Sequence, residues 1–94
     1  MNNYILKNSS RKDKKYMLVS DTGKKTHFGA ANMSDYTIHK DDARKDRYIA
    51  RHKTNENWDE INPGSLSRYI LWNKKTLNES IKDYEKLFNI KIVN

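Results

Sequence analysis

Residues 76–92 read TLNESIKDYEKLFNIKI, and this stretch decides the class of fold because its periodicity changes within it. From Leu77 to Phe88 the apolar side chains recur every three or four residues, as they do on one face of a helix. The apolar stripe consists of Leu77, Ile81, Tyr84, Leu87 and Phe88. After Asn89, the alternating apolar and charged residues 90–92 are typical of a strand. A helix followed at once by a strand predicts an α+β fold.

The start of this helix is marked by a capping box. The Thr76 side chain is expected to accept from the Glu79 amide, and the Glu79 carboxylate to accept from the Thr76 amide. Upstream, Asn62-Pro63 offers an N-cap residue followed by proline at the first helical position, which predicts a helix from Pro63 to about Asn73. A further helix is predicted from Lys40 to about Lys53, because this segment lacks Gly and Pro and runs from acidic to basic residues.

The first third of the chain has the pattern of strands. Short aromatic and branched runs predict an antiparallel meander over residues 4–6, 16–19 and 26–28. Asp21-Thr22-Gly23-Lys24 has hairpin chemistry, residues 8–15 are expected to form a solvated loop, and residues 29–34 a connection out of the sheet. We therefore expect one α+β domain over residues 1–94, in which a small antiparallel sheet, made of the N-terminal meander and the C-terminal strand, packs against three helices.

Composition restricts the classes of protein. Ninety-four residues are too few for two separate cores, and the lack of cysteine excludes disulfides, a thiolate nucleophile and Cys-based zinc sites. The first seven residues are too polar for a signal peptide, and the longest dense apolar run, residues 69–72, is far shorter than a membrane helix. We expect a protein that is not secreted and does not cross the membrane.

The chain is strongly basic, with a formal charge of +7 from 19 Lys and Arg against 12 Asp and Glu. On the predicted helix, one narrow sector carries the cations Lys40, Arg44, Arg47 and Arg51. Such a ridge suits successive phosphates of a nucleic-acid backbone. The alternative is an ordinary solvated helix face, whose charge is partly compensated by Asp41, Asp42 and Asp46.

A second basic group lies near the predicted hairpin. Residues 7–25 hold seven basic and two acidic side chains. The candidate phosphate contacts in this region are Arg11, Lys12, Lys14, Lys15, Lys24 and Lys25. These lysines also fit a loop that is merely kept soluble, and the abundance of Lys, Asn and Ile is what an AT-rich coding bias would produce.

Residues 69–72 are apolar nearly all round a helix and are expected to form the core rather than a partner surface. Leu71 and Trp72 point in different directions from the main stripe, so one of them is a candidate for a homodimer interface. Trp58, in a polar loop, is the other interface candidate, and it could also stack on a base or cover the edge of the core.

No catalytic constellation is present. His27, His39 and His52 are scattered, and the spacing of His39 to Asp41 and Asp42 matches no metal-binding motif. We expect no enzyme activity, no metal and no cofactor, and we identify no small-molecule substrate. A metal-dependent nuclease that uses these aspartates and a histidine stays open as a third class.

Two segments, residues 34–41 and 67–74, resemble an uncharacterised family of small basic proteins of nucleocytoplasmic large DNA viruses. The similarity covers Arg44, Arg47, Tyr48, Ile49, Arg51 and His52, then Thr76, Leu77, Ser80 and Ile81, and extends from about Lys15 to Lys86. Members often carry proline where this chain has Lys75. The resemblance brings no reaction or catalytic residue, and implies a viral protein of the virion or of the infected cell's cytoplasm or nucleus.

The residues favour a non-enzymatic protein that binds nucleic acid, double-stranded DNA above all, through phosphate contacts with little sequence preference. The rival is a structural or host-interaction protein of the virion, acting as a homodimer without direct DNA binding.

Overall fold

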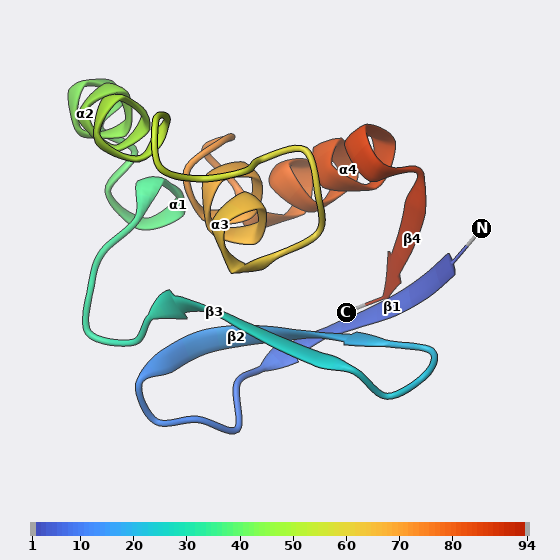
Figure 1. Cartoon of the computed structure of the whole chain (residues 1–94). Helices are drawn as coiled ribbons and strands as arrows, with labels where there is room; N and C mark the ends of the chain where they lie inside the picture. The colour runs from blue at the N-terminus through green and yellow to red at the C-terminus, as the bar shows by residue number, and fades with distance from the viewer. Residues whose placement is uncertain (1, 94) are drawn as a thin grey trace.

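The computed structural model describes residues 2–93, which form a four-stranded sheet covered on one side by helices (Figure 1). The strands lie in the order β3-β2-β1-β4. They are β1 (Asn2–Asn8), β2 (Lys14–Ser20), β3 (Lys25–Ala30) and β4 (Ile90–Val93). The predicted α+β class, with N-terminal strands and a C-terminal strand in one sheet, is confirmed.

The meander places alternate side chains against the helices. In the antiparallel pairs, Leu6 lies opposite Leu18 and Tyr16 opposite Phe28, and the turn after β2 uses Gly23 at a φ of 90°. β4 pairs with β1 in the parallel direction, so the sheet is mixed rather than antiparallel throughout. The parallel direction arises because the chain crosses the helical layer before it enters β4.

The helical layer contains more elements than the sequence predicted. It consists of α1 (Tyr36–His39), α2 (Asp42–His52), α3 (Pro63–Leu66), the π-helical turn η1 (Ser67–Leu71) and α4 (Leu77–Phe88). The single helix predicted from Lys40 is wrong at its start. Lys40 adopts a left-handed φ of 56° and ends α1, and Asp41 then caps α2 by accepting from the amides of Ala43 and Arg44.

The helix predicted from Pro63 to Asn73 begins as expected and ends early. Asn62 and Ser65 form a reciprocal capping box at the start of α3. At the other end the Trp72 amide donates to the Ser67 carbonyl at 3.0 Å, which closes the wide turn η1 and stops the helix at Leu71.

Thr76 caps α4 in a different way from a full capping box. The Glu79 amide donates to the Thr76 hydroxyl oxygen at 3.2 Å, as predicted. The Glu79 carboxylate accepts from the Thr76 hydroxyl at 2.9 Å instead of from the Thr76 amide.

The core lies between the sheet and the helices. Its buried members are Leu6, Leu18, Phe28, Leu66, Ile70, Leu71, Ile81, Tyr84, Ile90 and Ile92. Leu87, which the apolar stripe of α4 included, is 53% exposed because it lies at the edge of that stripe near the end of the helix. No helix within residues 2–93 is both long and apolar enough to span a membrane.

Candidate functional site

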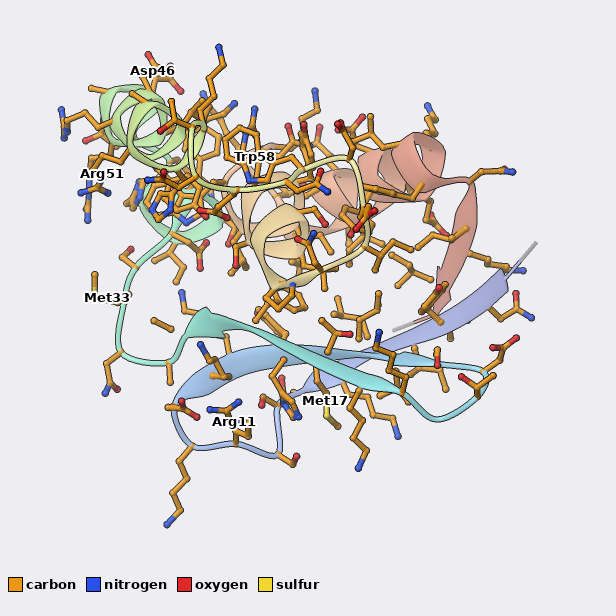
Figure 2. All side chains as sticks on the ribbon, viewed as in Figure 1. Arg11, Met17, Met33, Asp46, Arg51 and Trp58 are labelled. Atoms are coloured by element: carbon orange, nitrogen blue, oxygen red, sulfur yellow. The ribbon has the colours of Figure 1, made fainter. Side chains whose placement is uncertain are left out.

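The arginine ridge, which we define as Arg44, Arg47 and Arg51, lies on α2. All three side chains are exposed, and none forms an ion pair with another residue of the described chain. In Figure 2, Asp46 lies on the far side of α2 from the sheet, and Arg51 projects from another side of the same helix. The acidic residues of α2 therefore leave the ridge positively charged.

Lys40 does not belong to this ridge. It follows α1 rather than lying on α2, and its Nζ donates to the carbonyl of Thr37 at 2.6 Å. The predicted four-cation ridge is thus corrected to three arginines, because the left-handed turn at Lys40 breaks the helical spacing.

A cleft of about 350 Å³ opens between α2, the sheet and η1. Lys14 and Lys15 of β2, Gly29 and Ala30 of β3, and Arg51 and His52 of α2 line it. Two basic groups that are distant in the sequence therefore meet in one hollow. Gly29 allows η1 to pack closely on β3 at the floor of this cleft, because it has a φ of 79° and a Cβ there would lie 2.7 Å from Leu71 Cδ1.

The Lys15 ammonium is neutralised inside the cleft by Asp35. These two side chains form an ion pair whose carboxylate is only 3% exposed. Asp35 also caps α1, since it accepts from the amide of Thr37 at 2.9 Å. Lys15 therefore holds α1 to the sheet, and Lys14 and Arg51 are the cations of the cleft without an ion pair in the described chain.

Stacked aromatic rings form one wall of the cleft. The ring centroids of Tyr48 and Trp72 are 4.4 Å apart with an angle of 2° between the planes, and His52 packs on Tyr48 at 4.3 Å. His52 also contacts the Glu56 carboxylate. Burial, with a smaller contribution from Glu56, raises the pKa of Tyr48 to about 12. Tyr48 thus presents an uncharged ring to the cleft.

The other predicted basic residues lie toward the β1–β2 and β2–β3 turns. Arg11, Lys24 and Lys25 border a second hollow, of about 340 Å³, beside the N-terminal half of β3. Arg11 is paired with Asp13, and its hydrogen bond holds the pKa of that exposed carboxyl below its usual value. Lys12 is exposed in the turn between β1 and β2. The hairpin cations therefore divide between two hollows and one turn.

The predicted interface residues are mostly occupied within the chain. Leu71 is 2% exposed, so its assignment to a dimer surface is wrong, because η1 turns it into the core. Trp72 is covered on one face by Tyr48. Trp58 is half-buried, packs edge-on against Tyr69 and lies under the Arg68 guanidinium, 5.5 Å from its ring centroid.

The residues considered for a nuclease have structural partners. His39 Nδ1 accepts from the Asp41 amide at 2.9 Å, Asp41 caps α2, and Asp42 accepts from the Tyr36 hydroxyl. Within residues 2–93, no three His, Asp or Glu side chains gather as a metal-binding group. The nuclease hypothesis gains nothing from this arrangement.

Sequence reasoning missed Asp35, Met33 and Arg68. Asp35 carried a usable signal, because an aspartate just before a helix is a common N-cap. Met33 is exposed and lines the cleft. Figure 2 shows that it lies between the sheet and α2. Arg68 donates to the Trp72 carbonyl at 2.9 Å and lies over the Tyr69 ring. No local sequence pattern predicts these contacts.

Comparison with known families shows which family the first half of the chain matches. The model of a family described as "Family of unknown function (DUF5754)" matches residues 4–52, more than half of the chain. The match spans β1 to α2 and so includes the cationic side of the cleft, whereas Trp72 on the aromatic wall lies outside it. Neither the curated proteins nor the solved structures gave a match.

Proposed function

The chain belongs to the DUF5754 family of unknown function, and we propose that it is a non-enzymatic protein that binds nucleic acid. The partner is double-stranded DNA, held through its phosphates with little sequence preference. The proposal rests above all on one observation: Arg51 of α2 and Lys14 of β2 line the same cleft. Cations that served only to keep the protein solvated would not have to lie together in one cleft.

The arginine ridge gives this cleft a cationic extension. Arg44 and Arg47 continue from Arg51 along the exposed side of α2, and guanidinium groups bind phosphate oxygens in a bidentate manner. Together with Lys14 they offer four unpaired cations to a polyanion.

β3 connects the cleft with the second basic hollow. The cleft includes Gly29 and Ala30 at the end of β3, and the hollow includes Lys25 at its start. Five residue steps in a strand span roughly 17 Å, which is the length of about five base pairs of duplex DNA. The two sites therefore suit phosphates of one backbone rather than two separate ligands.

The resemblance of residues 34–52 and 67–81 to small basic proteins of large DNA viruses supports a setting in the virion or the infected cell. In that setting, sequence-independent binding suits a protein that accompanies or packages a genome, because phosphate contacts carry no base information.

The second candidate is a homodimer. The surface that favours it is not the one predicted from the sequence. Ile5 and Val93 are register partners on the sheet face away from the helices, and they are 44% and 53% exposed. This apolar patch is what a structural virion protein would bury against a second copy. Light scattering separates the candidates, because a stable dimer without DNA affinity supports only the second.

An electrophoretic shift assay with duplex DNA across a salt series tests the leading proposal. We expect retardation that weakens steeply with salt, and its loss in the variant Arg44→Ala/Arg47→Ala/Arg51→Ala. A matched control is Lys82→Ala/Lys86→Ala on α4, which removes two exposed cations far from the ridge in sequence and on another helix. Equal DNA affinity of the ridge variant and the wild type would overturn the proposal.

A further inference from the structure

The cleft beside α2 has features that a duplex backbone does not require. Contacts to backbone phosphodiesters require only accessible cations, yet the cleft adds an aromatic wall and a concave shape. Its volume of about 350 Å³ lies at the lower end of the range of small-molecule sites. We propose that this cleft binds a nucleoside monophosphate, with its phosphate on Lys14 and Arg51 and its base along the wall formed by Tyr48 and Trp72.

The charge of the cleft matches a terminal phosphate. Asp35 neutralises Lys15 and Glu56 contacts His52, so Lys14 and Arg51 remain as two uncompensated cations among the described residues. A phosphate monoester carries a charge of about −1.5 to −2 at pH 7. A backbone phosphodiester carries a single negative charge, so the pair is better matched by a phosphate at the end of a strand or on a free nucleotide.

The carboxylate in the cleft does not oppose an anion. The two oxygens of Asp35 are occupied, one by the Lys15 ammonium and the other by the amide and hydroxyl of Thr37. The side chain is also almost completely buried. It therefore organises the floor of the site and presents no free negative charge to the ligand.

The wall and the mouth of the cleft supply contacts for a base. Tyr48 and Trp72 form a rigid apolar surface, because their rings are already stacked on each other. Met33, which is 64% exposed, stands in the lining, and a thioether packs well against an aromatic ring. The π-helical turn η1 contributes Ser67 and Leu71 to the same lining, and such turns are frequent at functional sites.

This site is separable from the duplex contact, although both use Arg51 and Lys14. Arg44 and Arg47 do not line the cleft, so they serve only the duplex. Ala30 does line it, at an exposed position of β3 whose register partner is Lys14, and its replacement by phenylalanine fills the cleft without removing a charge.

The test uses a Trp58→Phe background, in which Trp72 is the only tryptophan. Fluorescence of Trp72 is followed while deoxyadenosine 5′-monophosphate, deoxyadenosine or inorganic phosphate is added. We expect saturable binding of the nucleotide, and weaker binding of the nucleoside and of phosphate. Lys14→Ala and Ala30→Phe should each raise the Kd for the nucleotide by about tenfold, and Arg44→Ala/Arg47→Ala should leave it within about twofold.

A second arm identifies the source of the phosphate. A short oligonucleotide with a 5′-phosphate is compared with the same oligonucleotide without it, in the presence of the free nucleotide as competitor. Preference for the phosphorylated strand assigns the cleft to strand ends, and no preference, with the nucleotide still bound, assigns it to free nucleotides. Absence of saturable nucleotide binding, or equal affinity for nucleotide and inorganic phosphate, would overturn the proposal.

The two proposals fail independently. Loss of duplex binding in Arg44→Ala/Arg47→Ala with unchanged nucleotide binding supports both. The nucleotide site alone is ruled out if the wild type binds duplex DNA but does not respond to the nucleotide, and if Ala30→Phe binds the duplex with the wild-type affinity. The proposed function stands in that case.

Discussion

The side chains of Tyr48 and Trp72 stack with their ring planes 2° from parallel, and this contact joins α2 to the end of η1. Tyr48 is the buried residue of α2, whose remaining side chains are exposed or half-buried. This aromatic pair therefore helps to fix the position of the arginine ridge relative to the core.

Replacing Tyr48 by alanine should release α2 more than the rest of the molecule. Removal of a buried aromatic ring costs about 3 kcal/mol or more of unfolding free energy. Hydrogen exchange should show lost protection at the α2 amides and retained protection in β2, because β2 is paired with a strand on each side, β1 and β3. Tyr48→Phe keeps the stack and is the control. Uniform loss of protection in both elements would contradict this role.

The same tyrosine predicts a loss of stability at alkaline pH. Its pKa is about 12 in the folded protein, mainly because of burial, against about 10 in the unfolded chain. The folded state keeps a proton that the unfolded state loses, so this contribution is complete below about pH 10 and disappears as the pH rises to about 12. Urea unfolding at several pH values should show the decline.

The control for this pH dependence is Tyr48→Phe, which cannot ionise. Its decline should be shallower than that of the wild type. It should not vanish, because burial also raises the pKa of Tyr84. Identical pH profiles of the two proteins would show that Tyr48 does not contribute.

The fold was predictable where short-range chemistry decides it. The turn at Gly23, the cap at Asn62 and the change of period at Asn89 each lie within a few residues of the structure that they specify. The direction of β4 was not predictable in this way, because it depends on the path of the whole helical layer. The left-handed Lys40 was also missed, since lysine gives no signal for a positive φ.

The candidate site was predictable only in its parts. The helical period of Arg44, Arg47 and Arg51 was visible in the sequence, and so was the concentration of lysines near the hairpin. Their meeting at one cleft depends on contacts between distant segments, such as the pair of Lys15 with Asp35. Tertiary packing therefore supplied the relationship that carries the proposed function.

The pair of Lys15 and Asp35 predicts strong coupling in a double-mutant cycle. Lys15→Met leaves a nearly buried carboxylate without its cation, which should lower the unfolding free energy by about 3 to 5 kcal/mol. Lys15→Met/Asp35→Asn removes both charges and keeps an acceptor for the Thr37 amide, so it should recover most of this loss. Urea unfolding of the four proteins measures the coupling. Additive losses would show that the pair has no structural role.

Lys40 and Arg47 are both exposed cations in the segment that was predicted to form one helix. Their substitution should nevertheless affect DNA binding differently. Lys40 has a φ of 56° at the end of α1, a conformation that glycine adopts without strain. Lys40→Gly should therefore retain or raise the unfolding free energy, by up to about 1 kcal/mol, and keep the salt dependence of DNA binding. Arg47→Ala should reduce the magnitude of the slope of log affinity against log salt by about 0.9, the contribution of one phosphate contact. A Lys40→Gly protein whose slope falls as much as that of Arg47→Ala would place Lys40 in the DNA contact, and a ridge of three arginines would then be wrong.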